Sequence, residues 1–222
     1  NGGDKHLTDV LTRGMWSRRE TFSLSGDSDW CAVKRADDAS SFECYYRGTS
    51  IGTVSWNMIG DYNLLNALAA AAAAHAIGVD FTSILNGLSS FRGVAKRMET
   101  LVSSDAITVV RDFAHHPTAI AGALTALRQR FNSDRLITML EVGSRTMQRH
   151  VDVSHLGQAL SAADRVLVLR SSEVQWPLES LESHLGERLM LVDSAECCVQ
   201  WLMQHRQHGD RVILLSNKHF NG

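Results

Sequence analysis

Two adjacent histidines and an aspartate stand together at the end of a predicted strand. The run Asp112-Phe113-Ala114-His115-His116-Pro117 follows the predicted strand 107–111 and opens directly onto an amphipathic segment. A helix N-terminus presents unpaired N–H groups to an anion, and histidine titrates near neutral pH. This run therefore predicts an anion-binding place where protons are handled. Two alternatives stay open, surface histidines and a chance metal pair, although adjacent side chains usually diverge, which disfavours joint ligation of one zinc ion.

A second polar loop follows the next predicted strand, Leu136–Glu141. It contains Ser144, Arg145 and Thr146, whose hydroxyl groups and guanidinium group suit recognition of a carboxylate. Taken alone, an arginine such as Arg145 is more often an ordinary solvated loop cation. Ligands of open α/β sheets bind outside the carboxyl ends of the strands, so these loops are the places to look for a site. Sequential parallel strands are often neighbours, so the two strands are expected side by side, with both loops at one edge of the sheet.

The first half of the chain carries two closely spaced asparagines. Asn63 is predicted to cap the helix that follows, and Asn66 then lies on the same side of the first turn. An amide both donates and accepts hydrogen bonds, so the pair can read an adenine edge. Simple capping is the favoured alternative. Arg97 and Glu99 flank Met98 in a segment predicted to be extended, which ordinarily indicates a surface ion pair.

The elements that position these residues differ between the two halves. Short strands are predicted in the first half at 30–34, 41–47 and 49–58, with a hairpin turn at Arg47-Gly48, followed by helices from Tyr62 to Ile77 and after Asp80. The second half alternates strands and helices. The strands are predicted at 107–111, 136–141, 166–170, 189–193 and 212–216, and the helices at 117–131, 155–163, 178–185 and 195–208. This alternation predicts an α/β fold with a mostly parallel sheet covered on both faces.

The composition bounds the class of protein. The chain has 222 residues with a formal net charge of −2, which gives no reason to expect a nucleic acid or an anionic membrane as partner. No apolar run approaches the ~20 residues needed to span a bilayer. Four cysteines without zinc-site spacing favour free thiols in a reducing cytoplasm. Two domains are predicted, residues 1–101 and residues 102–222.

Three motifs in this order resemble the signature of the Mur ligase family: Gly60…Asn63…Asn66-Ala67, then Arg97-Met98-Glu99, then Asp112-Phe113-Ala114-His115-His116-Pro117. The resemblance covers the whole chain. It implies the end of the family's central ATP-binding domain, followed by a Rossmann-like, peptide-binding C-terminal domain. Within the family, Gly14-Met15-Trp16-Ser17, residues 113–120 and Ser144-Arg145-Thr146-Met147 are most similar to the branch that uses a murein tripeptide.

The resemblance implies a cytoplasmic enzyme of peptidoglycan recycling. Such an enzyme uses ATP and Mg²⁺ to activate UDP-N-acetylmuramate as an acyl phosphate, which the amino group of L-Ala-γ-D-Glu-meso-diaminopimelate attacks. By matching, residues of the nucleotide site are Tyr62, Asn63, Asn66, Arg97 and Asp112. Residues of the peptide site are His115, His116, Ser144, Arg145 and Thr146, and catalytic roles fall to Arg97 and His116. No metal ligand is predicted within these residues.

Several features depart from the family pattern. Tyr62 replaces a usual histidine, Arg111 a usual acidic residue, Gly143 a usual arginine, and Lys218-His219 a usual diglycine. No GxxxxGK[ST] phosphate loop occurs in the sequence. We therefore expect a C-terminal half that lacks the phosphate-binding and UDP-sugar-binding segments and is inactive alone. Three alternatives remain: a UDP-N-acetylmuramate–L-alanine ligase, a non-catalytic peptide-binding module, and a metal-dependent hydrolase.

Overall fold

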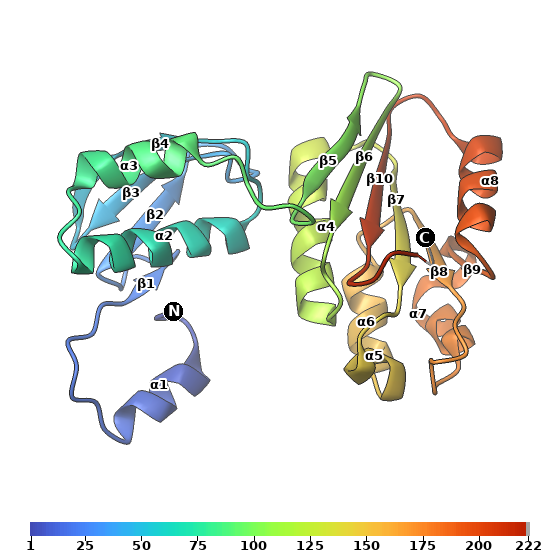
Figure 1. Ribbon diagram of the computed structural model, residues 1–222, viewed down its shortest axis with the longest axis horizontal. Coiled ribbons are helices and arrows are strands. Elements are labelled where there is room, and N and C mark those ends of the chain that lie inside the picture. The colour runs from blue at the N-terminus through green and yellow to red at the C-terminus, as the bar shows by residue number, and fades with distance from the viewer. Residues whose placement is uncertain (221–222) are drawn as a thin grey trace. The chain divides into compact units, whose positions relative to one another are not determined.

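The computed structural model describes residues 1–220 and divides the chain into two compact units, Asn1–Gly93 and Val94–Gly222 (Figure 1). This division lies eight residues before the predicted boundary after residue 101. The reason is a strand that the predicted boundary would divide: β5 (Glu99–Ser103) pairs with β6 (Ile107–Asp112) and so belongs to the second unit. Within residues 1–220, no helix is both long and apolar enough to cross a membrane.

The first unit contains a four-stranded sheet in the order β1-β2-β3-β4. The strands are β1 (Phe22–Ser23), β2 (Trp30–Lys34), β3 (Ser41–Tyr46) and β4 (Thr49–Ser55), and the helices are α1 (Lys5–Thr12), α2 (Asp61–Ala76) and α3 (Phe81–Ser90). Helices α2 and α3 pack against the sheet, whereas α1 has no buried residue (Figure 1). Arg47 and Gly48 join β3 to β4 with φ values of 49° and 80°, which confirms the predicted hairpin turn. The core is built from Trp30, Phe42, Leu64 and Leu68, all with no exposed surface.

The N-cap of helix α2 lies three residues before the predicted cap, Asn63. Gly60 is the N-cap, with a φ of 89° that glycine adopts without strain. Asn63 therefore does not cap the helix, and this prediction was wrong. Its side chain is buried in the first turn, where Nδ2 donates to the Ile59 carbonyl oxygen at 2.8 Å. The predicted cap of α3 is confirmed, because the Asp80 carboxylate accepts from the Ser83 amide at 2.9 Å.

The second unit is a six-stranded sheet in the order β5-β6-β10-β7-β8-β9. Strands β6, β7 (Leu136–Glu141), β8 (Arg165–Leu169), β9 (Leu189–Val192) and β10 (Asp210–Leu215) are parallel, and β5 is antiparallel to β6. The predicted mostly parallel α/β sheet is therefore confirmed. Every residue of β7 is buried, as expected for a strand covered on both faces.

The helices of the second unit are α4 (Pro117–Phe131), α5 (Arg145–Arg149), α6 (Val153–Leu160), α7 (Glu182–Leu185) and α8 (Ala195–His205) (Figure 1). Helix α4 buries Ile120, Leu124 and Leu127, the apolar face predicted from their spacing. Helix α8 packs through Cys198 on the side of the sheet that carries Met139. The predicted helix 178–185 is instead a 3₁₀ turn (Leu178–Leu181) followed by the single turn α7.

The strand order corrects one prediction. Strands β6 and β7 were expected to be neighbours, because sequential parallel strands often are. The last strand, β10, lies between them and pairs with both. The loops that follow β6 and β7 still lie at the same edge of the sheet, but two strand spacings apart, about 10 Å.

Candidate functional site

The chemistry-bearing residues of the second unit gather at the carboxyl edge of its sheet. Strands β6, β7 and β10 end there at Asp112, Glu141 and Leu215. The loops after β6 and β7 touch each other, since Ser144 Oγ donates to the His115 carbonyl oxygen at 3.5 Å, a long hydrogen bond. The two polar loops predicted from the sequence are therefore brought together.

Asp112 is almost completely buried, with 4% of its surface exposed. Its two carboxylate oxygens accept hydrogen bonds from the Met98 and Ala114 amides, each at 2.7 Å. Burial raises the pKa of Asp112 above its usual value, against the opposing effect of these two amides. In this structure Asp112 fastens the segment before β5 to the end of β6, and its predicted contact with a ribose stays a prediction.

The segment that Asp112 holds is an unusual backbone turn. Lys96 and Met98 have φ values of 59° and 49°, in the left-handed region that few side chains favour. Glu99 pairs with Arg111 at 2.8 Å and also accepts from the Lys96 amide, so the ion pair expected between Arg97 and Glu99 is not formed. The Arg111 hydrogen bond lowers the pKa of Glu99. Arg97 itself is exposed, and its guanidinium lies 5.2 Å from the Phe113 ring centroid.

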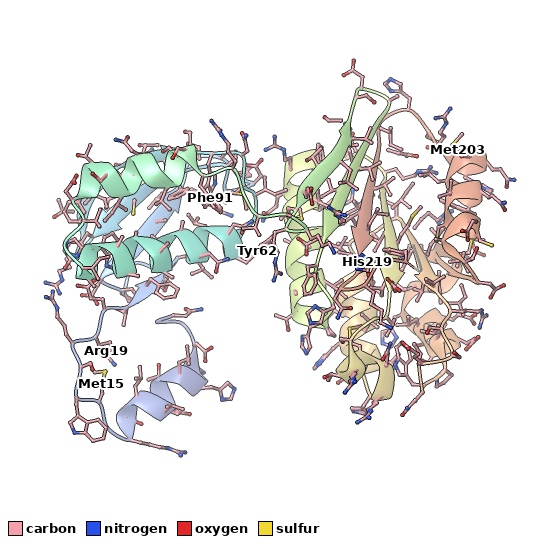
Figure 2. The ribbon with its side chains drawn as sticks, in the orientation of Figure 1. Met15, Arg19, Tyr62, Phe91, Met203 and His219 are labelled. Carbon is pink, nitrogen blue, oxygen red and sulfur yellow. The ribbon has the colours of Figure 1, made fainter. Side chains whose placement is uncertain are left out.

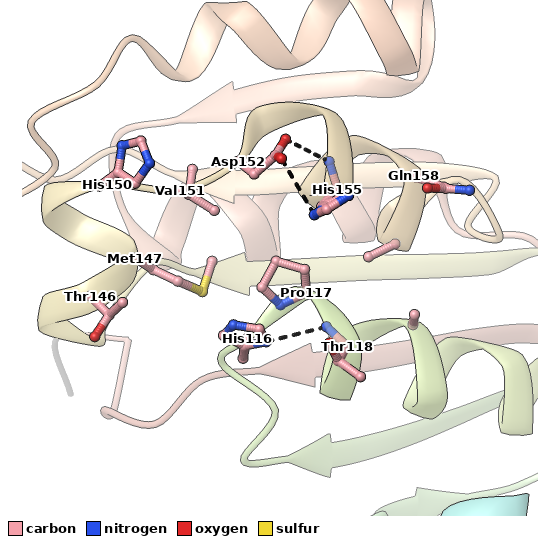
Figure 3. A pocket seen from close by; sticks show the side chains of 12 residues that line it. His116, Pro117, Thr118, Thr146, Met147, His150, Val151, Asp152, His155 and Gln158 are labelled. Carbon is pink, nitrogen blue, oxygen red and sulfur yellow. Dashed lines mark hydrogen bonds and ion pairs between the residues drawn. The ribbon is translucent and has the colours of Figure 1, made fainter. Parts of the chain in front are cut away.

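The two histidines point to different partners, as expected of adjacent side chains. His115 Nδ1 bonds to the Phe113 carbonyl oxygen at 2.9 Å. His116 caps α4, and its Nδ1 accepts from the Thr118 amide at 3.4 Å (Figure 3). Pro117 occupies the first turn of this helix, where its missing N–H has no intrahelical partner to lose.

In the loop after β7, Ser144 caps the short helix α5 through the Met147 amide at 3.3 Å. Arg145 and Thr146 are exposed in the first turn of that helix. Thr146 faces the same cavity as His116, whereas Arg145 does not line it. The predicted peptide-side residues are therefore close together but do not share one surface.

This cavity has a volume of about 590 Å³, within the range of small-molecule sites. Its walls come from α4, α5 and α6, together with the segment that joins α5 to α6 (Figure 3). The polar lining residues that were not assigned to a site from the sequence are Thr118, His150, Asp152, His155 and Gln158. A sequence signal for two of them existed: Asp152 caps α6 by accepting from the His155 amide at 3.1 Å, a spacing typical of helix starts.

A second polar cluster lies where β10 ends. The buried carboxylate of Glu141 accepts from the Ser216 hydroxyl and from the Phe220 amide. Lys218 forms an ion pair with Glu173, to which Gln148 also donates. A Cβ atom added at Gly143 would lie 2.3 Å from Asn217 Oδ1 and 2.9 Å from Lys218 Cγ. The departures from the family pattern at Gly143 and at Lys218-His219 therefore lie next to each other, because side chains after Ser216 fill the volume that a side chain at position 143 would need.

The adenine-side residues belong to the first unit. Asn63 is buried and Tyr62 is half-buried, whereas Asn66 is exposed in the first turn of α2. Asn66 thus offers a carboxamide to a ligand, and Asn63 serves the helix start. The sequence contains no GxxxxGK[ST] phosphate loop. Within residues 1–220, no three His, Cys, Asp or Glu side chains are arranged to hold a metal ion.

Comparisons with known proteins agree with this picture. The family described as "Mur ligase, glutamate ligase domain" matches residues 96–218. The UDP-N-acetylmuramate–L-alanyl-γ-D-glutamyl-meso-2,6-diaminoheptandioate ligases of Haemophilus influenzae and Escherichia coli are 31% and 32% identical to this chain, covering 100% and 99% of it. A crystal structure of a murein peptide ligase from Psychrobacter arcticus is 30% identical, with a TM-score of 0.71, over 99% of this chain and 48% of that one.

The chain spans about half the length of the curated relatives it matches, 49% and 48%. The match to the family begins at residue 96, within the segment that Asp112 holds, and ends at residue 218, beside Gly143. It therefore contains the carboxyl edge of the sheet with both polar loops and the whole lining of the cavity. On this evidence the chain belongs to the Mur ligase family.

Proposed function

We propose that this chain contributes the peptide-binding side, and part of the nucleotide-binding side, of a cytoplasmic ATP-dependent amide ligase. The reaction joins UDP-N-acetylmuramate to L-Ala-γ-D-Glu-meso-diaminopimelate during peptidoglycan recycling. The observation that carries the proposal is the cavity between His116 and Thr146, at the sheet edge where α/β proteins bind ligands. It lies in a chain that is similar, along its whole length, to ligases named for that peptide.

The reaction activates the muramate carboxylate as an acyl phosphate, with ATP and Mg²⁺, and the peptide amino group then attacks it. Negative charge gathers on the phosphoryl oxygens in the transition state, where a guanidinium group stabilises it. Arg97 suits this role because its side chain is exposed and its guanidinium is held near the Phe113 ring. On the nucleotide side we assign Asn66 and Tyr62 to the adenine, with Asn63 supporting them and Asp112 near the ribose.

His116 is better suited to binding than to proton abstraction in this geometry. Its Nδ1 accepts from the Thr118 amide, so the neutral imidazole carries its proton on Nε2. An Nε2–H group donates to a peptide carboxylate and cannot also accept the proton of the attacking amine. We therefore assign His116 to orienting the peptide, together with His115, Ser144, Arg145 and Thr146.

The test is substrate choice by the intact ligase that carries this chain. Amide formation is measured with UDP-N-acetylmuramate, ATP and Mg²⁺, and with either the tripeptide or free L-alanine as the amine. We expect product with the tripeptide. Product with L-alanine alone would identify the alanine-adding branch of the family instead. Tripeptide binding without any ATP-dependent product would identify a peptide-binding module.

Residues 1–222 assayed alone serve as a control. We expect no phosphate release above background, because the backbone amides and lysine of a phosphate loop are needed to hold the β- and γ-phosphates, and the sequence lacks that loop. Steady ATP hydrolysis by this polypeptide would contradict the assigned division of roles.

A further inference from the structure

The cavity between α4 and α6 is lined by polar side chains besides His116 and Thr146. Across from His116, its wall carries His150, Asp152 and His155 (Figure 3). Between these polar groups lie apolar side chains, including Met147 and Val151. A cavity of this kind suits a ligand with a short methylene chain that ends in polar groups.

Asp152 is the one carboxylate in this lining. It caps α6, with Oδ1 on the His155 amide at 3.1 Å and Oδ2 at 3.4 Å from His155 Nδ1. The His155 amide is the main cause of a lowered pKa of Asp152, with smaller contributions from the His155 and His150 imidazoles. The carboxylate is therefore held ionised and in place by α6. A carboxylate has about four acceptor positions, so it retains capacity for a ligand ammonium group.

His150 stands two residues before Asp152 and lines the same cavity. Its backbone amide ends α5 by donating to the Thr146 carbonyl oxygen at 3.0 Å, which fixes the position of the residue. Its side chain is exposed, so the imidazole is accessible to a ligand. An imidazole N–H donates well to a carboxylate. The wall thus has a carboxylate, Asp152, that can accept from a cation, and an imidazole, His150, that can donate to an anion.

We propose that this wall binds the zwitterionic end of the peptide's third residue, with its ammonium group on Asp152 and its carboxylate on His150. This inference rests on the proposed function and assigns specificity within it. The free end of meso-diaminopimelate carries both charged groups on one carbon, beyond three methylene groups. A lysine in the same place carries an ammonium group only. The chain thereby distinguishes the two peptides through residues outside the predicted site.

The experiment measures the affinity of the 222-residue chain for three synthetic peptides by NMR titration. All begin with L-Ala-γ-D-Glu, and the third residue is meso-diaminopimelate, L-lysine or L-2-aminopimelate. The free end of meso-diaminopimelate carries both an ammonium group and a carboxylate. The free end of L-lysine carries only the ammonium group, and that of L-2-aminopimelate only the carboxylate. Each missing group is expected to weaken binding by about tenfold to a hundredfold, as for loss of one hydrogen bond to a charged partner.

Two variants assign the groups to residues. Asp152→Asn keeps a good helix cap but removes the anion, and it should abolish the preference for diaminopimelate over aminopimelate. His150→Phe keeps a flat ring but removes the donor, and it should abolish the preference for diaminopimelate over lysine. The matched controls are Asp105→Asn and His208→Phe, which change an exposed residue of the same type away from the cavity. If Asp152→Asn does not fold, Asp152→Ser provides the alternative cap.

The outcomes separate the inference from the proposed function. If the variants keep both preferences of the wild type, or if the wild type binds all three peptides equally, the assignment of Asp152 and His150 is wrong while tripeptide binding stands. If no peptide perturbs resonances of the cavity, the inference and the placement of the peptide on this chain both fail. Loss of the matching preference in each variant, and in neither control, supports the inference.

Discussion

Replacing Asp112 tests whether this residue acts first as a structural fastener. Asp112→Ala removes both acceptors from the Met98 and Ala114 amides, each now bonded at 2.7 Å. A hydrogen bond to a charged group contributes about 1.5–3 kcal/mol net, but burial of the carboxylate offsets part of this. We therefore expect a loss of about 2–4 kcal/mol from the free energy of unfolding of the second unit, or roughly 4–12 °C in its Tm.

Asp112→Asn sharpens the test because it preserves size and changes one acceptor into a donor. A carboxamide can accept from one of the two amides, and its NH₂ group then faces the other amide. That backbone N–H and the NH₂ group are then both left without an acceptor, so this variant is expected to lose about 1–3 kcal/mol despite its similar shape. Asp105→Asn, at an exposed position before β6, is the matched control and should unfold like the wild type.

Two assays read the effect on Asp112 variants. Urea unfolding gives the change in free energy, and hydrogen exchange of the Met98 and Ala114 amides reports the fastener directly. The pH dependence gives a third check. The pKa of Asp112 is raised in the folded state, so the folded state binds a proton more readily than the unfolded state. The contribution of Asp112 to stability therefore falls as the pH rises from its unfolded-state pKa, about 3.9, through its folded-state pKa. The difference between wild type and Asp112→Ala should show that slope. Unchanged exchange of both amides, with unchanged stability, would refute the reasoning.

Three further predictions concern the proposed site. Arg97→Ala in the intact ligase should lower kcat by about a hundredfold or more, with little change in stability, and a near wild-type kcat in steady-state assays would make Arg97 an ordinary surface cation. Arg145→Ala should raise the KM for the tripeptide while the KM for ATP stays constant, and Arg206→Ala serves as the control. An unchanged KM for the tripeptide would make Arg149 the next candidate. Gly143→Ala should cost about 1–3 kcal/mol in urea unfolding, because its Cβ would overlap Asn217, and full stability would mean that the residues after Ser216 move aside freely.

Much of the fold is predictable because its signals are local. The cap of α3 depends on Asp80 and Ser83, three residues apart, and the β3–β4 turn depends on Arg47 and Gly48 alone. Strand β5 carries no such signal, because four of its five residues are exposed and show no alternation. Its identity as a strand comes from pairing with β6 across a hairpin, a contact that the pattern of residues 99–103 does not encode.

The site was predictable in part for the same reason. His116 and Thr146 each follow the end of a parallel strand, so position along the chain was enough to find them. His150 and His155 reach the cavity because α5 ends at Arg149 and α6 packs beside α4. Figure 2 shows the side chains of the chain as sticks. Asn63 shows the opposite error, since its type and spacing suggested a cap, while the backbone of Gly60 already begins the helix.

The position of β10 connects two of the departures from the family pattern, the one at Gly143 and the one at Lys218-His219. Because β10 runs between β6 and β7, the residues that follow it are directed to the start of the loop after β7. The side chains of Asn217 and Lys218 there occupy the space beside Gly143, so a larger side chain at position 143 requires these two side chains to move. Lys218, held by Glu173, places a cation near the position where the family usually has an arginine. Positions 143 and 218 are 75 residues apart in the sequence, and they lie side by side because β10 runs between β6 and β7.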